Sequence, residues 1–202
     1  MTIQVLCFAA ILSFSFGLLM GILSCHRLKI PILTPLIEGI AFVLRAVPFY
    51  VQLMIVYFVL PELLGFNFNP FWASVISLGF CSSGYMAQIV RAGINSIPIA
   101  QWEAAYALGY STYQSLRWVI IPQMVRNVLP AFNNELDSLL KTTSVVSTIG
   151  LLELTRVGMN LVSRELEPVP IYLMIALVYL VMSALLNGAG RLFERRLRYA
   201  RS

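Results

Sequence analysis

Charged residues are scarce in this chain of 202 residues, in which Asp, Glu, Lys and Arg together make up only 11%. Soluble domains carry about 25% charged and about 45–50% apolar residues. This chain is 59% hydrophobic and has a mean hydropathy of +0.82. So little polar surface cannot cover a water-exposed globule, which argues against a soluble enzyme, a disordered tail or a secreted disulfide scaffold. The composition indicates an integral membrane protein.

Residues that carry chemistry are equally few, with three cysteines and one histidine. Cys7, Cys25 and Cys81 show neither metal-ligand spacing nor a paired framework, so we predict no metal site. The chain has no H-E-x-x-H, no paired catalytic aspartates and no G-x-x-x-x-G-K-[ST] phosphate loop. The net charge of +5 comes from scattered basic residues, which argues against nucleic acid. We therefore expect neither an enzyme nor a bound cofactor.

Long apolar runs are what the chain has instead, and a run of about 20 apolar residues crosses a bilayer as a helix. Three runs contain no charge: Met1–Cys25, Leu63–Val90 and Pro168–Gly190. The first lacks the basic start of a signal peptide, so we interpret it as a span.

Two further segments are less uniform. Gly39–Leu60 is interrupted by Arg45 and Pro48, and Pro130–Leu152 carries charged residues. Taken alone, Pro130–Leu152 also fits an amphipathic helix on the membrane surface. Counting both segments predicts five spans.

The distribution of Lys and Arg supports that number, because basic residues favour cytoplasmic loops. With five spans and the N-terminus outside, only Arg156 and Arg164 lie in an outer loop. The inner loops and tail hold Arg27, Lys29, Arg91, Arg117, Arg126, Arg191, Arg195, Arg196, Arg198 and Arg201. We therefore predict an all-α membrane protein, with residues 1–202 forming one transmembrane domain and the C-terminus in the cytoplasm.

The long inner loop at about residues 91–122 reads as a helix between turns. Ser96 is a candidate N-cap, Pro98 suits an early helical position, and Gly109 suits a left-handed residue that ends the helix. Ser111 or Thr112 then caps a second helix that runs to Pro122. Small side chains on the first helix let another protein approach its backbone closely.

Within this loop, Glu103-Ala-Ala-x-x-x-Gly109 is followed by Val119-x-Ile121-Pro122. This spacing resembles the cytoplasmic EAA loop of permease subunits in bacterial ABC importers, with Val119 and Ile121 replacing the usual Ile and Leu. Three further stretches resemble the polar amino-acid uptake branch of the family: 42–52, 91–103 and 139–144. The likeness covers nearly the whole chain.

The resemblance implies a type I importer permease core of the MetI-like kind in the bacterial inner membrane. It implies a second permease copy or paralogue, a cytoplasmic ABC ATPase dimer that binds ATP and magnesium, and a periplasmic or lipid-anchored amino-acid-binding protein. The residues that would couple to the ATPase are Glu103, Ala104, Ala105, Gly109 and Pro122. Pro122 is equally explained as the start or a kink of the fourth span.

Polar residues within the spans are candidates for the substrate path, since ionisable groups are costly in a bilayer. Asn133, Asp137 and Lys141 share one helical face, and the acid precedes the base by four residues. These two either pair structurally or meet the charges of a zwitterion, and the sequence leaves both interpretations open.

Gln52, Tyr85 and Gln88 complete the candidate path. Relatives often carry an acid at the position of Gln88, so the cargo class stays open. We expect Arg45 and Pro48 to shape the start of the second span. Glu135 would face water at the inner mouth or contact the partner, and the tail arginines Arg195, Arg196 and Arg198 would anchor at lipid headgroups.

Two alternatives remain open. The same machinery would serve another small metabolite, or the chain is a channel-like or structural membrane subunit without an ATPase.

Overall fold

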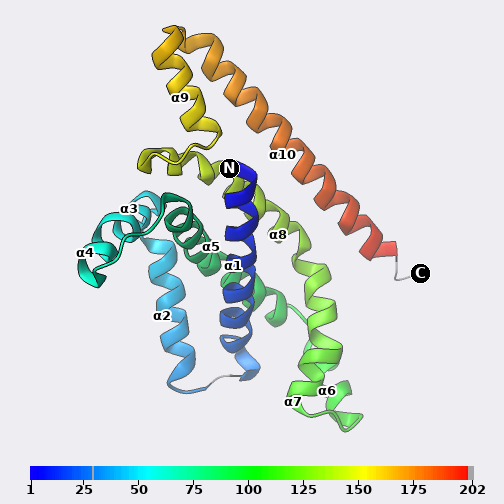
Figure 1. Ribbon diagram of the computed structural model, residues 1–202. Coiled ribbons are helices and arrows are strands. Elements are labelled where there is room, and N and C mark those ends of the chain that lie inside the picture. The colour runs from blue at the N-terminus through cyan, green and yellow to red at the C-terminus, as the bar shows by residue number, and fades with distance from the viewer. Residues whose placement is uncertain (29, 200–202) are drawn as a thin grey trace.

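The structure, a computed structural model, describes residues 1–28 and 30–199, and within these ranges the chain is built from helices (Figure 1). In chain order the elements are α1 Thr2–Leu23, η1 His26–Leu28, α2 Leu33–Ala46, α3 Phe49–Met54, η2 Ile55–Val59, α4 Leu60–Leu64, α5 Pro70–Asn95, α6 Ile99–Ala107, α7 Thr112–Ser115, η3 Leu116–Ile120, α8 Ile121–Thr142, η4 Thr143–Ile149, α9 Leu154–Glu165 and α10 Pro168–Tyr199.

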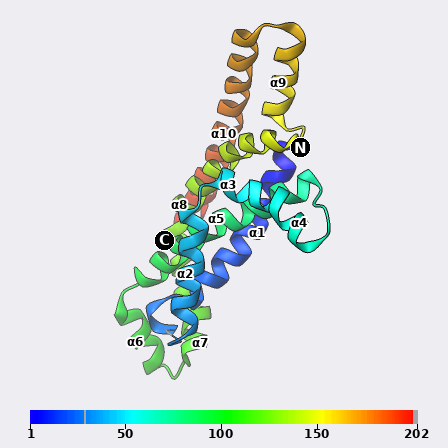
Figure 2. The ribbon, with the colours of Figure 1, turned by 90° about the vertical axis from the view of Figure 1, so that its left-hand side faces the viewer.

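Three helices in the described ranges are long and apolar enough to cross a membrane: α1, α5 and α10 up to Arg196. Two bent helix pairs bring the number to five if each pair counts as one span. In Figures 1 and 2, α10 runs along one side of the bundle, and the turn between α9 and α10 lies at the end opposite to α6 and α7.

The second predicted span is not one helix. α2 meets the segment Phe49–Leu64 at an angle of 99°. The break lies at Val47, which is extended with φ −81° and ψ 127°, and at Pro48, which begins the next segment. A proline lacks the N–H that would continue the helix and forces the residue before it out of the helical region. The predicted span Gly39–Leu60 is therefore a bent pair of helices, broken at the predicted interruption.

The fourth predicted span starts earlier than expected. A helical segment runs from Thr112 to Ile149, so Pro130 lies inside α8 and does not begin it. Pro122 also lies within this segment, directly after the π-helical turn η3. A π turn contains one extra residue, so its N–H groups donate to carbonyls one position further back than in an α-helix. This change in hydrogen bonding accommodates a proline, which has no N–H to donate. The predicted second loop helix, from Ser111 or Thr112 to Pro122, is thus continuous with the helix of the fourth span.

Close packing of α1 on α5 forms the centre of the bundle. Gly17 and Gly21 are four residues apart on α1, and a Cβ on Gly21 would lie 2.6 Å from Cβ of Val90 and 2.8 Å from the carbonyl of Ala87. A Cβ on Gly17 would collide with Met86. Two small residues at this spacing let helix backbones approach in a membrane, where van der Waals packing drives association.

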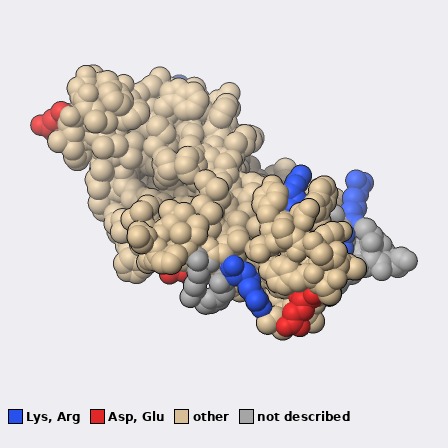
Figure 3. Space-filling view, turned by 90° about the horizontal axis from the view of Figure 1, so that it is seen from below, with Lys and Arg blue, Asp and Glu red and all other residues tan. Residues whose placement is uncertain are grey.

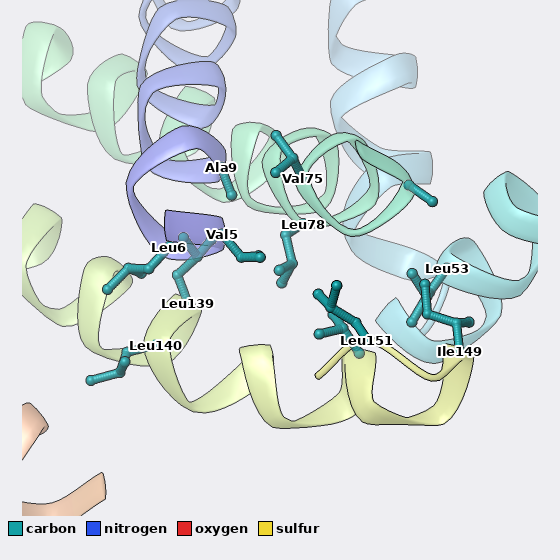
Figure 4. Packing of buried hydrophobic residues seen from close by; sticks show 12 residues of the cluster. Val5, Leu6, Ala9, Leu53, Val75, Leu78, Leu139, Leu140, Ile149 and Leu151 are labelled. Atoms are coloured by element: carbon teal, nitrogen blue, oxygen red, sulfur yellow. The ribbon is translucent and has the colours of Figure 1, made fainter. Parts of the chain in front are cut away.

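Two apolar clusters make up the core. The first joins α1, α3, α5, the end of α8 and η4, as Figure 4 shows; it consists of Val5, Leu6, Ala9, Leu53, Ala73, Val75, Leu78, Leu139, Leu140, Val146, Ile149 and Leu151. The second lies at the other end of α5 and α8; it consists of Cys25, Met86, Val90, Ile94, Ile97, Trp102, Leu116, Ile120, Met124, Val128 and Phe132. The second cluster attaches α6 to the membrane helices through Trp102.

Candidate functional site

The helix predicted in the inner loop is α6, but its start differs from the prediction. Pro98, not Ser96, occupies the N-cap position. The Ser96 hydroxyl donates to the carbonyl of Gly93 at 2.8 Å and so belongs to the end of α5. Ser96 was assigned wrongly because α5 extends further into the loop than the predicted span.

The end of α6 confirms the role predicted for Gly109. Gly109 has φ +82°, its N–H donates to the carbonyl of Tyr106 at 2.9 Å, and the N–H of Tyr110 donates to that of Ala105 at 3.1 Å. These two bonds form a Schellman motif, which requires a left-handed residue at this position. Ser111 then caps α7, because its hydroxyl accepts from the N–H of Gln114 at 3.3 Å.

The two sides of α6 differ in burial. Trp102 and Ala105 are each only 2% exposed and pack inward. Glu103 and Ala104 are exposed on the other side. Large apolar side chains also lie open around this helix, namely Ile99, Tyr106, Leu108, Tyr110 and Tyr113. Seen from this end, the molecule shows few charged side chains (Figure 3). The exposed part of the loop thus combines large apolar side chains with Glu103 and the polar residues Gln101, Ser111 and Gln114.

A cavity of about 460 Å³, called here the first cavity, lies between the bend at Pro48 and helices α5 and α8. Its polar lining includes Arg45, Ser82, Tyr85 and Glu135. Tyr85 and Glu135 also line the second cavity, of about 450 Å³, together with Gln88, Ser96 and Asn127. The shared residues make the two cavities neighbours on the faces of α5 and α8.

Opposite charges line the first cavity. The Glu135 carboxylate accepts a hydrogen bond from Ser82 at 2.6 Å, and Ser82 in turn accepts from Ser13 at 2.8 Å. The Arg45 guanidinium donates to the side-chain oxygen of Gln88 and, at 3.1 Å, to the carbonyl of Ala41. Among the described residues, neither Glu135 nor Arg45 is in an ion pair. One carboxyl residue and one arginine therefore line this cavity without forming an ion pair.

Arg45, Ser82 and Glu135 were not among the predicted path residues, although the sequence held a signal for two of them. Arg45 and Glu135 are ionisable groups within predicted spans. Ionisable groups are costly in a membrane, so they more often have a functional role than a packing role there. Their convergence depends on the bend after α2 and on the packing of α5 against α8. Neither of these is visible in a linear pattern.

Asp137 and Lys141 form an ion pair, with 2.6 Å between Oδ2 and Nζ. Asp137 also accepts from Ser183 on α10, and Asn133 donates to Asn187 of α10 at 2.9 Å. The Lys141 side chain is 63% exposed, against 15% for Asp137. Asn133 and Asp137 thus join α8 to α10.

The six predicted path residues therefore separate. Tyr85 lines both cavities and Gln88 lines the second, whereas Gln52, Asn133, Asp137 and Lys141 line neither. The Gln52 amide donates to the carbonyls of Leu44 and Val47, at 2.8 Å each. Within residues 1–28 and 30–199, no group of three His, Cys, Asp or Glu side chains is placed to hold a metal ion.

Comparison with known proteins identifies the family. The model of the family described as "Binding-protein-dependent transport system inner membrane component" matches residues 13–199. The chain belongs to this family. It is therefore a multi-pass permease of the inner membrane and a transport subunit of an ABC transporter, not an enzyme. Membership also gives it ATPase and permease partners, and it removes the alternative of a structural subunit without an ATPase.

Individual relatives agree with this assignment. The permease is 37% identical to the arginine transport system permease protein ArtQ of Bacillus subtilis (strain 168) over 191 residues, covering 93% of this chain and 87% of ArtQ. It is 35% identical to the glutamine transport system permease protein GlnP of Escherichia coli (strain K12) over 159 residues, covering 77% of this chain and 72% of GlnP.

Solved structures show the same fold. A chain from the crystal structure of an amino acid ABC transporter with histidines superposes on the permease with a TM-score of 0.88 at 34% identity, covering 97% of this chain and 90% of the other. A chain of the inward-facing MetNI methionine ABC transporter superposes with a TM-score of 0.83 at 19% identity, covering 97% and 92%. The fold of the permease is MetI-like.

Proposed function

We propose that this permease carries a polar amino acid into the cell, driven by ATP that a separate ATPase hydrolyses. The observation that carries the proposal is the first cavity, whose lining includes Glu135 and Arg45. An amino acid bears an ammonium and a carboxylate, which complement these two groups. Relatives named for arginine, glutamine and L-cystine transport support this class of cargo.

The proposed topology has five spans, formed by α1, the bent pair of α2 with α3–α4, α5, the part of the segment Thr112–Ile149 that follows Arg126, and α10. The N-terminus lies outside and the C-terminus in the cytoplasm, which agrees with the excess of Lys and Arg in the loops assigned to the inside. Arg195 and Arg196 are exposed near the end of α10 and would meet anionic headgroups. The side chains of Lys29, Arg198 and Arg201 lie outside the described residues. Residues 1–202 would act as one domain.

The proposed coupling element is α6 with its flanking turns. Glu103, Ala104 and the exposed apolar side chains would contact a groove of the ATPase. Ala105 faces the permease interior, so its role would be packing. Gly109 would reverse the chain after α6, and Pro122 would shape the helix that carries the movement into the fourth span.

The proposed path uses Tyr85, Glu135, Arg45 and Gln88 on the two cavities. Gln52, Asn133, Asp137 and Lys141 would support the helices around it. A second permease copy or paralogue would complete the path, and a periplasmic or lipid-anchored amino-acid-binding protein would deliver the cargo. ATP and magnesium would bind to the ATPase dimer and not to this chain.

Cys81 provides a direct test, because it lines the first cavity whereas Cys25 is buried and Cys7 lies on α1. A variant with Cys7→Ser and Cys25→Ser retains one thiol, whose labelling by N-ethylmaleimide is followed with arginine, glutamine or cystine present. We expect one of these amino acids to slow the labelling. Glu135→Gln should raise the protecting concentration about tenfold or more, since a hydrogen bond to a charged group is worth about 1.5–3 kcal/mol.

Glu38→Gln is the matched control, because Glu38 lines neither of these cavities and pairs with Arg91. It should leave protection unchanged. If none of the three amino acids protects Cys81 from labelling and another small metabolite does, the cargo is that metabolite's class and not a polar amino acid. Equal effects of the two substitutions would remove Glu135 from the path.

A further inference from the structure

The bend leaves the carbonyl groups at the end of α2 without helical donors, and those of Leu44 and Val47 are two of them. In a continuous helix the N–H of residue 48 would donate to the carbonyl of Leu44, but Pro48 has no N–H. The N–H of Val51 would donate to the carbonyl of Val47, but it donates to the carbonyl of Pro48 at 2.9 Å. Unpaired carbonyls are costly in a low-dielectric environment, so this break needs a substitute donor.

One side chain supplies both donors. The amide nitrogen of Gln52 lies 2.8 Å from the carbonyl oxygen of Leu44 and 2.8 Å from that of Val47. A primary amide carries two N–H groups, so it can donate to both oxygens at once. Gln52 lies on α3, one turn after the bend, and therefore joins the two helices across the break.

We infer that Gln52 is a positioning residue that holds the 99° bend and thereby sets the wall of the first cavity. The five residues that bracket the bend, Arg45 to Phe49, all line that cavity. A change in the angle would move the Arg45 guanidinium relative to Glu135 on α8. The amide acts through the backbone and does not need to touch the cargo. The effect of the bend on cargo in the first cavity rests on the proposed function, whereas the role of Gln52 in the bend does not.

The bend can be measured without any cargo. Phe42 on α2 and Leu63 on α4 are 64% and 74% exposed, which suits nitroxide labels introduced as Phe42→Cys and Leu63→Cys in the full chain without its native cysteines. Electron–electron double resonance then reports the distance across the bend. We expect a narrow distribution for the parent and a broader or shifted one for Gln52→Leu. Tyr50→Leu, an exposed neighbour on α3, should match the parent.

A second variant separates positioning from a general loss of folding. Pro48→Ala restores an N–H that can donate to the carbonyl of Leu44. Combined with Gln52→Leu, it should recover the yield of folded protein and give a longer distance than the parent, because the helix straightens. A Gln52→Leu distribution equal to that of the parent would overturn the inference. So would a Gln52→Leu protein that fails to fold and is not recovered by Pro48→Ala.

Cargo protection of Cys81 completes the test on separate protein that retains this thiol. Gln52→Leu should raise the protecting concentration several-fold, as Tyr50→Leu should not. If the parent shows no protection while Gln52→Leu still alters the distance, the proposed function fails and the role of Gln52 in the bend stands. If the parent is protected while Gln52→Leu leaves the distance unaltered, the proposed function stands and the role of Gln52 in the bend fails.

Discussion

The hydroxyl of Tyr179 on α10 donates a hydrogen bond of 3.1 Å to the carboxylate of Glu153, which is 1% exposed at the start of α9. The same carboxylate accepts from the backbone N–H groups of Thr155 at 2.9 Å and Arg156 at 2.7 Å. Glu153 thus caps α9 and joins it to α10. This buried acid therefore contributes to the α9–α10 hairpin together with the contact between the hydroxyls of Thr155 and Tyr179.

Tyr179→Phe should destabilise the permease by about 1–3 kcal/mol, because it removes one donor from a buried charge. Thermal unfolding in detergent measures the effect. Tyr172→Phe is the matched control on the same helix, since Tyr172 is 48% exposed. Equal melting temperatures for the two variants would show that the Tyr179 bond contributes nothing.

Gly109→Val should abolish ATP-driven uptake while membrane insertion stays intact. The reason is that a β-branched residue is strained at φ +82° and disrupts the end of α6. Co-purification from detergent measures whether the variant still retains the ATPase. Gly109→Asn should retain the ATPase, because Asn tolerates left-handed backbone, whereas Glu103→Lys should lose uptake through its reversed charge. Undiminished uptake by Gly109→Val would refute the coupling assignment.

Trp102→Ala should reduce the amount of cargo moved per ATP hydrolysed. This ring attaches α6 to the second apolar cluster, and truncating a buried Trp costs about 3–5 kcal/mol. Uptake and ATP hydrolysis measured together in proteoliposomes give the ratio. Trp102→Phe fills part of the space that Trp102→Ala leaves empty, so it should give a ratio between those of the alanine variant and the parent. A normal ratio in the alanine variant would mean that α6 transmits movement by another contact.

Gly21→Val should reduce the yield of folded protein, because its side chain would overlap Val90 and the backbone of Ala87. Overpacking typically costs about 1–3 kcal/mol and more where backbone atoms are involved. Gly39→Val provides the comparison, since no atom lies within 4 Å of a Cβ at that position. Size-exclusion chromatography in detergent distinguishes the two, and matching profiles would contradict the close approach of α1 to α5.

Gly190→Ala should break the Asn133–Asn187 hydrogen bond, because the added methyl group would occupy the position of the Asn133 amide. The expected loss is about 1 kcal/mol, the usual net value of a neutral hydrogen bond. A Cβ at Gly188 would have no atom within 4 Å, so Gly188→Ala should leave the free energy of unfolding unchanged. Urea or thermal unfolding of both variants provides the measurement; a neutral Gly190→Ala would place α10 further from α8.

Composition and charge were sufficient to predict the helical membrane class, and short-range rules were sufficient for the left-handed Gly109 and for the shared helical face of Asp137 and Lys141. Each of these depends on residues within one or two helical turns. Pro130 was wrongly interpreted as the start of the fourth span, because α8 begins at Ile121 and continues through it. Pro122, proposed as a start or kink of that span, lies in the first turn of α8 after a π turn that keeps the helix continuous. The spacing of Gly17 and Gly21 was a readable signal for close helix packing.

The cavity could not be predicted in the same way. Arg45 and Glu135 are far apart in the chain, and they line one cavity only because α2 ends in a sharp bend and α8 packs against α5. Gln52 illustrates the same difficulty. An amide in an apolar span suggests a ligand, yet in the structure its two donors are used by the backbone of the preceding helix.

The opposite burial of Ala104 and Ala105 has a consequence for how this loop can change over evolution. Ala104 lies on the outward side of α6, so under the proposed function its size is limited by another protein. Ala105 is enclosed by this chain, so the size of its side chain is limited by the residues of this chain that α6 packs against. Substitutions at Ala104 should therefore be compensated in the gene for the ATPase, and substitutions at Ala105 within this chain. Two adjacent alanines of one motif would then diverge under separate selection.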